Sequence, residues 1–370
     1  MRILHVSTAL SWRGGEQQLT YLIESLKSMD IDQMVFCPHG SAIEQYCKDF
    51  NIAHYSFYRS NLKLILAHSM MSACHANGIN VIHTHDSHSH TLAVLASTVY
   101  GCSVPIVVSK RTAFPMKAGF FSRHKYNHPS IARILCVSDR VQNEVAKVMY
   151  KNEKLTTVYS GVELRRFMQK EKPTLSLESF GDNLARPFIG NVSALSNEKD
   201  FFTFVDTAEA YYKKGRVGTF FVVGEGVFRM KLERYIQQKG LTKKVILTGF
   251  QKNVPMVMKQ LDCFLFTSKL EGLGTSILDA MASKVPVVAT KTGGIPELVL
   301  DRQTGLLVSV KDFEAMADSI IRILDDEKLR AHLIEEAFRH VRKFTKEKMA
   351  VQTVNEYYQA AYVLQPVLVH

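Results

Sequence analysis

Apolar runs of strand length alternate with segments of helical period along most of the chain. In the first 140 residues the helical patterns at 16–29 and 62–78 lie among five strand-like runs: RILHVST, QMVFCP, NVIHTH, VPIVVSK and RILCVSD. Strands that are apolar on both faces and alternate with helices are typical of a parallel sheet covered by helices on both sides. The pattern therefore predicts an α/β, doubly wound parallel sheet.

The alternation stops over residues 164–187, which are polar, aperiodic and contain two prolines. It resumes from Phe188 with six more strand-like runs: FIGNVSAL, GTFFVVGEG, KVILTGF, CFLFTS, VPVVAT and GLLVSV. Because 370 residues exceed what one core usually fills, we expect two domains. The predicted boundaries are 1–165 for the first domain, 166–187 for a linker and 188–344 for the second domain, with a last helix at 345–362 long enough to pack back on the first domain.

Composition narrows the class of protein further. The net charge of +11 indicates an anionic partner without identifying it. The six cysteines are scattered, which favours reduced, buried thiols over a disulfide framework or a zinc site. No window of about 18 residues is apolar and uncharged, and the chain opens on a strand pattern instead of a signal peptide. We therefore expect a cytoplasmic protein.

Ligands of open α/β sheets bind beyond the carboxyl ends of the strands, so the loops at those ends are the first places to look for chemistry. After the first strand, Gly14 and Gly15 precede a helix. Glycines allow close backbone approach, and a helix N-terminus offers N–H groups to an anion such as a diphosphate. A pair of glycines before a helix is equally common as a tight turn, so both interpretations stay open.

Residues 263–284 carry a more specific pattern, in which a strand (CFLFTS), a loop (KLEGLG) and a helix (TSILDAMASK) follow one another. Thr275 or Ser276 is the predicted N-cap. Glu271 then lies in the loop and Asp279 about one turn into the helix. Carboxylates accept hydrogen bonds from vicinal hydroxyls of a sugar or ribose, and the loop amides from Gly272 onward would meet a phosphate. This set predicts a sugar-nucleotide site; the alternative is a solvated Glu271 and an Asp279 that only favours the helix dipole.

Together these segments resemble the retaining GT-B glycosyltransferases of glycosyltransferase family four. The resemblance runs over the whole length and is strongest in its last segment: the GG loop at Gly14, VYSGVELRRF at 158–167, IGNVSALSNEKD at 189–200, VVGEG at 222–226, LTGF at 247–250 and EGLGTSILDAMASKVPVVATKTGGIPELV at 271–299. It implies two Rossmann-like domains that face each other across a cleft, with a nucleotide-diphosphate sugar bound mainly by the second.

The resemblance also implies roles for individual residues. Glu271 would hold hydroxyls of the donor sugar, and Asp279, where the family has a glutamate, would contact the ribose. The family usually holds the diphosphate with an arginine and a lysine. Ala194 stands at the arginine position here, so Lys199 would stabilise the diphosphate without that partner, and Arg13 or Arg229 could share the task. The residues implied in donor binding are Gly14, Gly15, Lys199, Gly224, Phe250, Val254, Glu271, Gly272, Leu273, Gly274, Thr275 and Asp279.

The first domain departs from the family where many members have a histidine near the reacting sugar. This chain has Ser109, Lys110 and Arg111 there. The histidine role of those members therefore has no counterpart at this loop. We expect the basic pair Lys110 and Arg111 to contact a phosphate or an acidic sugar on the acceptor.

A histidine-rich stretch, IHTHDSHSHTLA, supports a competing class of function. Its possible metal ligands are His83, His85, Asp86, His88 and His90, which approach the HxHxDH pattern of dinuclear metal hydrolases. The aspartate is displaced by one position, and no further ligands are evident in the second domain. We therefore expect no metal, a packed His83, a catalytic His85, and Asp86 and His88 in acceptor binding.

Residues 109–128 hold five basic residues and no acid, interleaved with aromatic residues that include Phe114, Phe120 and Phe121. Such a segment can dock on anionic lipid headgroups. The alternative is a solvated lid whose aromatic side chains pack inward. Nucleic acid is not an expected partner, because no recognised binding motif accompanies the charge.

The predicted function is a retaining glycosyltransferase of hexosyl type that moves a sugar from a nucleotide-diphosphate sugar to a glycan or lipid-linked acceptor. We expect a role in cell-surface polysaccharide or lipopolysaccharide synthesis at the inner face of the plasma membrane, with no cofactor and with a UDP-sugar as favoured donor. The alternatives are a metal-dependent hydrolase that uses the His83 to His90 cluster and a nucleotide-sugar-binding protein without catalysis.

Overall fold

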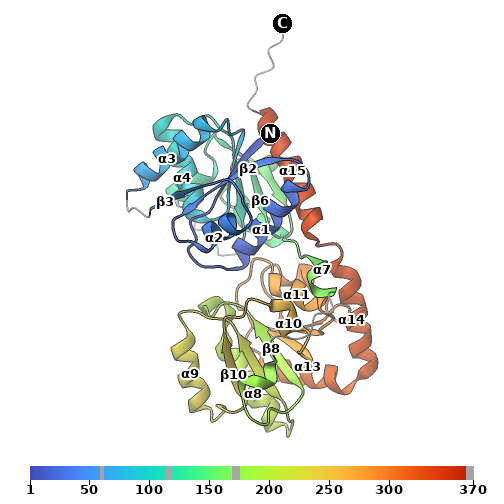
Figure 1. The fold of residues 1–370 in the computed structure, drawn as a ribbon. Coiled ribbons are helices and arrows are strands. Elements are labelled where there is room, and N and C mark those ends of the chain that lie inside the picture. Colours follow the sequence, from blue (N-terminus) through green and yellow to red (C-terminus); the bar gives the residue numbers. More distant parts are fainter. Residues whose placement is uncertain (59–61, 113–118, 169–175, 364–370) are drawn as a thin grey trace. The chain divides into compact units, whose positions relative to one another are not determined.

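A computed structural model describes residues 1–58, 62–112, 119–168 and 176–363 (Figure 1). The chain forms two compact units: unit 1 is residues 1–161 with the chain from Lys346 onward, and unit 2 is Val162–Thr345. The segment expected as a linker, 166–187, falls in unit 2, where α7 (Leu164–Met168) and η2 (Leu177–Phe180) are described. Residues 169–175 of that segment lie outside the described residues.

Unit 1 is built on a seven-stranded parallel sheet of order β3-β2-β1-β4-β5-β6-β7. Its strands are β1 (Arg2–Val6), β2 (Asp32–Pro38), β3 (His54–Phe57), β4 (Val81–Thr84), β5 (Ile106–Lys110), β6 (Ile131–Cys136) and β7 (Leu155–Thr157). Its helices are α1 (Gly14–Lys27), α2 (Ala42–Asp49), α3 (Lys63–Ala76), α4 (Ser87–Tyr100), α5 (Phe120–Tyr126), α6 (Asp139–Ala146) and α15 (Lys346–Val363). The sequence predicted every strand except β3 and β7, which are short edge strands with too few apolar residues to form a run.

The C-terminal helix α15 packs on unit 1, against α1 and one face of the sheet (Figure 1). A buried cluster joins strand residues Ile3 and Val81 to Tyr357 of this helix. Burying apolar surface is the dominant stabilising term in folding. The helix that ends the chain is thus part of the core of the unit that begins it.

Unit 2 repeats the architecture with a six-stranded parallel sheet of order β10-β9-β8-β11-β12-β13. Its strands are β8 (Phe188–Val192), β9 (Thr219–Val223), β10 (Val245–Gly249), β11 (Cys263–Phe266), β12 (Val287–Thr290) and β13 (Leu306–Val308). Its longer helices are α8 (Phe201–Lys213), α9 (Arg229–Gln238), α11 (Thr275–Ala282), α13 (Phe313–Asp325) and α14 (Glu327–Val341); α10 (Val254–Met258), α12 (Ile295–Leu298) and η3 (Asn197–Lys199) are short. The predicted α/β class is confirmed in both units.

The six cysteines are buried and unpaired, as the sequence predicted. Of the helices in the described part of the chain, none has the length and apolar character that crossing a membrane would need.

Candidate active site

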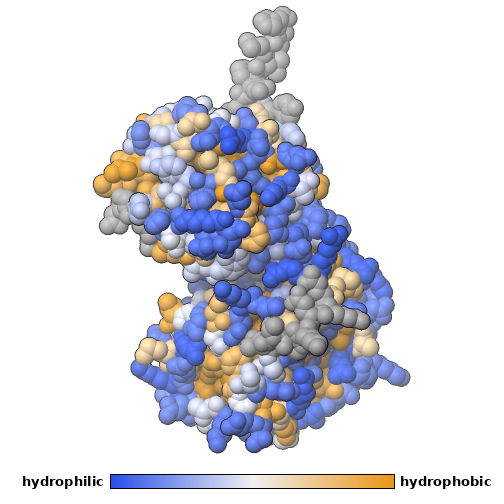
Figure 2. All heavy atoms as spheres, in the orientation of Figure 1, coloured by the Kyte–Doolittle hydropathy of each residue, from blue (hydrophilic) through white to orange (hydrophobic). Residues whose placement is uncertain are grey.

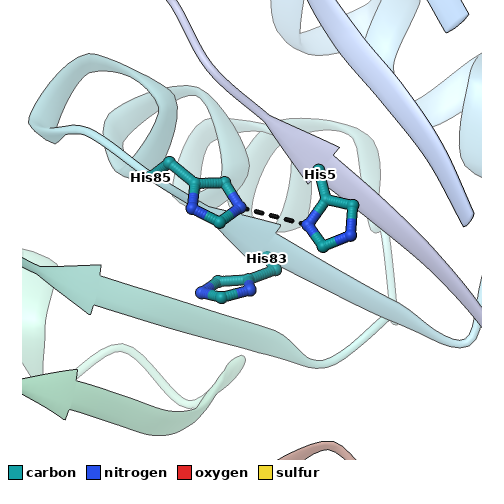
Figure 3. A group of neighbouring side chains, drawn as sticks. All are labelled: His5, His83 and His85. Atoms are coloured by element: carbon teal, nitrogen blue, oxygen red, sulfur yellow. Dashed lines mark hydrogen bonds between the residues drawn. The ribbon is translucent and has the colours of Figure 1, made fainter. Parts of the chain in front are cut away.

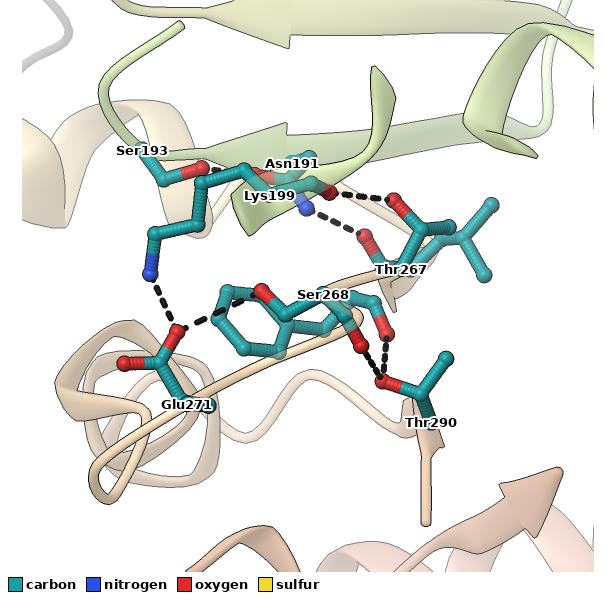
Figure 4. Close-up of polar contacts among 9 residues, drawn as sticks. Asn191, Ser193, Lys199, Thr267, Ser268, Glu271 and Thr290 are labelled. Atoms are coloured by element: carbon teal, nitrogen blue, oxygen red, sulfur yellow. Dashed lines mark hydrogen bonds and ion pairs between the residues drawn. The ribbon is translucent and has the colours of Figure 1, made fainter. Parts of the chain in front are cut away.

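The carboxyl edge of the unit 2 sheet brings together Lys199, from η3, and Glu271, from the loop after β11 (Figure 4). The Lys199 ammonium makes an ion pair with Glu271 Oε2, and it also lies 4.9 Å from the centroid of the Phe266 ring. The two side chains remain 20% and 15% exposed, so a ligand can reach both. Residues 72 positions apart in the sequence thus form one charged pair.

Hydroxyl groups hold this pair in place. Ser268 Oγ donates to Glu271 Oε2 at 3.3 Å, and Thr267 Oγ1 donates to the Lys199 carbonyl at 3.0 Å (Figure 4). Thr290 Oγ1, from the next strand, donates to the Ser268 carbonyl at 2.5 Å. The loops that carry the two charges are therefore anchored to β11 and β12.

The glycine pair after β12 fixes the backbone of Glu271, a role that was not predicted from the sequence. Gly293 has φ +55°, and a Cβ there would lie 1.8 Å from the Glu271 carbonyl oxygen. The amide of Gly294 donates to the same oxygen at 3.2 Å. The available signal was the TGG sequence at 292–294, one residue beyond the end of a strand, where a pair of glycines is typical of a close backbone approach.

Gly224, Phe250 and Val254, expected near the base, follow or open elements at the same edge of the sheet. Gly224 has φ +147°, and a Cβ there would lie 2.0 Å from the Ser193 carbonyl oxygen, so only glycine fits. Phe250 is half exposed (53%), which leaves its ring free to stack. Asn191 holds the end of β8 by donating to the Leu265 carbonyl at 2.7 Å (Figure 4).

Helix α11 begins at Thr275, but its N-cap is Gly274, at φ +95° and without a side-chain cap. The prediction of Thr275 or Ser276 as N-cap is wrong, because the chain enters the helix through a left-handed turn that glycine adopts most readily. Asp279 lies in the second turn of the helix, as predicted. Desolvation of its carboxyl raises the pKa to about 7, and the positive charge of Arg166 in α7 partly opposes this shift.

The two cations that could assist Lys199 are both engaged with acids of their own unit. Arg229 pairs with Glu225 and with Glu233, the latter at 2.8 Å, so its charge is already balanced. Arg13 of unit 1 is the N-cap of α1, which begins at Gly14 and Gly15, and its guanidinium lies 3.9 Å from Glu16. Within unit 2, Lys199 is therefore the cation that faces Glu271.

In unit 1, His83 and His85 meet a third histidine, His5, which lies outside the histidine-rich stretch and was not predicted to join them (Figure 3). His5 Nδ1 and His85 Nε2 lie 3.1 Å apart, and the ring centroids of His83 and His85 are 4.1 Å apart. Burial lowers the pKa of all three rings, that of His5 to about 4. His85, expected to be catalytic, is 7% exposed and turns its ring toward His5.

The remaining members of the histidine-rich stretch point elsewhere. Asp86 is the N-cap of α4 and accepts hydrogen bonds from the amide of Thr8 at 2.6 Å and from its hydroxyl at 2.8 Å. His88 is exposed, whereas His90 is buried with its ring 5.0 Å from that of Tyr126. The five candidate ligands of this stretch therefore do not form one dinuclear site: only His83 and His85 approach each other, while Asp86, His88 and His90 lie elsewhere.

Of the expected acceptor contacts, Lys110 is the last residue of β5 and Arg111 follows it, both in partly buried positions. Burial lowers the pKa of Lys110 and lowers that of Arg111 to about 10, with Glu16 acting in the opposite direction on Arg111. The buried Nε of Arg111 has no hydrogen-bond partner among the described residues. A charged group held this way favours an anionic partner.

The basic and aromatic segment 109–128 is described except for residues 113–118, so Phe114 and Lys117 lie outside the described residues. Phe120 and Phe121 of α5 are 79% and 86% exposed, so their rings do not pack inward. Lys125 donates to the Ser87 carbonyl at 2.7 Å and is engaged within unit 1.

Comparisons with known proteins divide the chain in the same way as the fold. Residues 12–166 match the family model Glycosyltransferase Family 4, and residues 176–340 match Glycosyl transferases group 1. The chain is 25% identical over 322 residues to N-acetyl-alpha-D-glucosaminyl L-malate synthase of Bacillus anthracis, covering 85% of this chain and 84% of the relative. It is 21% identical over 350 residues to UDP-Gal:alpha-D-GlcNAc-diphosphoundecaprenol alpha-1,3-galactosyltransferase of Escherichia coli, covering 89% of each.

The fold is also similar to that of Anabaena HepE, solved in complex with UDP-glucose. The TM-score is 0.83 at 20% sequence identity, over 96% of this chain and 98% of the other. This similarity supports the two-domain GT-B architecture that the sequence predicted.

Proposed function

Because this chain belongs to the GT-B glycosyltransferases, we propose that it transfers a sugar from a UDP-sugar to an anionic, glycan or lipid-linked acceptor with retention of anomeric configuration. The observation that carries the proposal is the Lys199 and Glu271 pair in the segment that matches Glycosyl transferases group 1. Both charges are partly exposed at the edge of a parallel sheet where ligands of such folds bind.

The pair has a direct use in this reaction. Glu271 accepts hydrogen bonds from the donor sugar hydroxyls, while Lys199 turns to the diphosphate that leaves. The amides from Gly272 to Thr275 add hydrogen-bond donors to the same phosphates. Since donor binding replaces one anionic partner of Lys199 by another, its positive charge stays compensated throughout.

In the proposed step the bond between the sugar C1 and the diphosphate oxygen breaks while the acceptor oxygen bonds to C1. The leaving phosphate takes the acceptor proton on the same face of the sugar, which retains the configuration. Lys199 stabilises the charge that develops on the diphosphate. This route needs no enzyme nucleophile.

UDP is the proposed nucleotide because the similar HepE structures contain UDP and UDP-glucose. An anionic acceptor is supported by Lys110 and by Arg111, whose Nε has no partner among the described residues. The names of the two relatives mention L-malate and a diphosphoundecaprenol-linked sugar, and both of these compounds carry negative charge.

A surface of unit 1 supports peripheral attachment to an anionic membrane. Apolar side chains gather over the region of α3 (Figure 2), where Leu62, Leu64 and Ile65 are 62%, 48% and 54% exposed. Burial lowers the pKa of Lys125 in α5, and the nearby charge of Lys63, at the start of α3, adds to this lowering. Helix α5 is also the helix that exposes Phe120 and Phe121. Apolar side chains beside basic ones are what an anionic headgroup surface binds. This supports work on lipid-linked acceptors, as in cell-surface polysaccharide or lipopolysaccharide synthesis.

A thermal-shift screen against UDP-, GDP-, ADP- and CDP-sugars tests the donor assignment. A ligand at 100 times its dissociation constant stabilises the native state by about 2.7 kcal/mol, which such a screen detects. We expect UDP-sugars alone to raise the melting temperature. NMR of the product formed from the best donor then gives the anomeric configuration, and an inverted product would contradict the retaining step.

A further inference from the structure

Three imidazoles converge on one face of the unit 1 sheet, from β1, from β4 and from the residue that follows β4 (Figure 3). His5 of β1 and His83 of β4 are register partners on neighbouring parallel strands, so their side chains point to the same face. His85 follows His83 by two residues and shares that face. One ring nitrogen from each histidine lies within 4.8 Å of the other two.

The hydrogen bonds of this cluster are incomplete. Buried polar groups in native proteins nearly always have a partner. His5 Nε2 and His85 Nδ1 have none among the described residues, although both atoms are buried. His5 Nδ1 and His85 Nε2 lie 3.1 Å apart and share one hydrogen bond, in which one of the two nitrogens carries the proton.

We propose that His5 Nδ1, His85 Nε2 and one ring nitrogen of His83 bind one divalent transition-metal ion, zinc in the first place. Zn–N bonds of about 2.0–2.1 Å place two ligand nitrogens of a tetrahedral ion about 3.3 Å apart, close to the 3.1 Å between His5 and His85. Imidazole suits zinc, copper and nickel, whereas magnesium and calcium prefer the oxygen ligands that these three side chains lack.

Neighbouring groups are suited to orient the three ligands. His83 bonds to Tyr357 Oη through Nδ1 and to Ser109 Oγ through Nε2 at 2.8 Å, so it keeps one of these partners when the other nitrogen binds the ion. Gln33 interacts with His5, and its buried Oε1, which lacks a hydrogen-bond partner among the described residues, can accept from His5 Nε2–H. Ligand histidines typically donate their second N–H to such a group.

The site has a structural consequence, because Tyr357 belongs to α15. An ion held by β1 and β4 next to this helix would strengthen the packing of the C-terminal helix on the sheet. The ion would therefore stabilise unit 1, and its role is independent of the transferase reaction proposed for Lys199 and Glu271.

The test uses the full chain without an affinity tag, stripped with a chelator and titrated with zinc chloride in competition with a chromophoric chelator. We expect one zinc ion per chain and a rise in melting temperature. Cobalt(II) in place of zinc should give the visible absorption bands of a tetrahedral site. The cobalt spectrum of the wild-type chain does not depend on the folding of any variant.

Variants identify the ligands. His5→Asn and His85→Asn should each weaken zinc binding by at least about 100-fold, and Gln33→Leu by about 10-fold, as for other groups that orient metal ligands. The matched control is His88→Asn, an exposed histidine of the same stretch, which should bind zinc like the wild type.

Two outcomes would overturn the proposal. One is a wild-type chain that binds no stoichiometric zinc and gives no tetrahedral cobalt spectrum, which would leave the cluster as hydrogen-bonded core histidines. The other is zinc binding that survives both His5→Asn and His85→Asn, which would assign the ion to surface histidines.

Discussion

Each unit places a cluster of polar side chains at its parallel sheet, but the two clusters differ in charge and in exposure to solvent. In unit 2, Lys199 and Glu271 carry full charges, keep part of their surface exposed and are supported by hydrogen bonds from serine and threonine. In unit 1, His5, His83 and His85 are buried, and burial keeps their rings neutral by lowering their pKa values.

This difference indicates that the two clusters have different roles. A charged pair that a ligand can reach is suited to exchange partners during a reaction, since each charge gains a new counter-ion when it loses the old one. Neutral rings closed off from water cannot take part in such an exchange. They are suited to hold a proton or a metal ion in a fixed place. This contrast agrees with the two proposals made above, in which the unit 2 pair binds the donor and the histidines have a structural role.

Removing the cation of the unit 2 pair should have the strongest consequence. Lys199→Ala should lower kcat by about 10²- to 10³-fold, a loss of roughly 3 to 4 kcal/mol of transition-state stabilisation, because the positive charge proposed to face the leaving diphosphate is lost. Steady-state kinetics with the donor found in the thermal-shift screen measure this.

The control for that change is Lys269→Ala, which alters a neighbouring lysine that contacts Asn197. It should leave kcat within about twofold of the wild type, as surface changes usually do. Equal turnover by Lys199→Ala and the wild type would remove Lys199 from the mechanism.

A second prediction separates the two acids of unit 2. Glu271→Gln should lower the transfer rate by about 10- to 100-fold while UDP alone binds nearly normally, because the proposed function has Glu271 contact the sugar and not the nucleotide. Asp279→Asn should weaken UDP itself by about tenfold, the cost of a hydrogen bond to ribose. Calorimetry with UDP decides between them, and an equal loss in both variants would show that the acids only support the loop and helix.

A third prediction concerns the outer surface of unit 1, in contrast to its buried histidines. Phe120→Ser with Phe121→Ser should weaken binding to vesicles of phosphatidylglycerol and phosphatidylcholine by about tenfold, because part of the benefit of burying two exposed rings is lost. Vesicle co-sedimentation measures this.

Two exposed lysines of unit 2 provide the matched control for that experiment. Lys231→Ser with Lys243→Ser lowers the net charge without touching the apolar surface, and it should bind vesicles nearly as the wild type does. Equal binding by the phenylalanine variant and the wild type would leave α5 as a solvated surface.

The last prediction concerns stability and follows from the pKa of Asp279. Its folded value of about 7 exceeds that of an unfolded aspartate, near 3.9. Between these values the folded state binds more protons than the unfolded state, so this group lowers stability as the pH rises from about 4 to 7. Asn cannot ionise, and Asp279→Asn should therefore be more stable than the wild type at pH 8.

Partial exposure of Asp279 limits the gain to about 1 to 2 kcal/mol at pH 8, with no gain near pH 4. Urea unfolding at the two pH values measures it, and Asp182→Asn, at an exposed aspartate, is the control. A gain of the same size at both pH values would assign the effect to packing instead of charge.

The α/β class, the two sheets and the segment that carries Glu271 and Asp279 could be predicted from the order of residues alone, whereas Lys199 came from the resemblance to a family. Near-continuous apolar runs identify buried parallel strands, and Glu271, the glycine loop and Asp279 lie within one segment of chain, where spacing along a loop and helix predicts their positions. The short edge strands β3 and β7 gave no such signal, because their few residues carry no apolar run.

Which distant residues meet became visible only in the folded chain. Strand register brings His5 beside His83, and packing of the C-terminal helix brings Tyr357 to the same ring. Gly293 supports Glu271 because a Cβ on residue 293 would come within 1.8 Å of the Glu271 carbonyl oxygen. The physical reason is that side-chain spacing predicts neighbours only within one helix, strand or turn, whereas the pairing of strands and the docking of helices depend on the packing of the whole core.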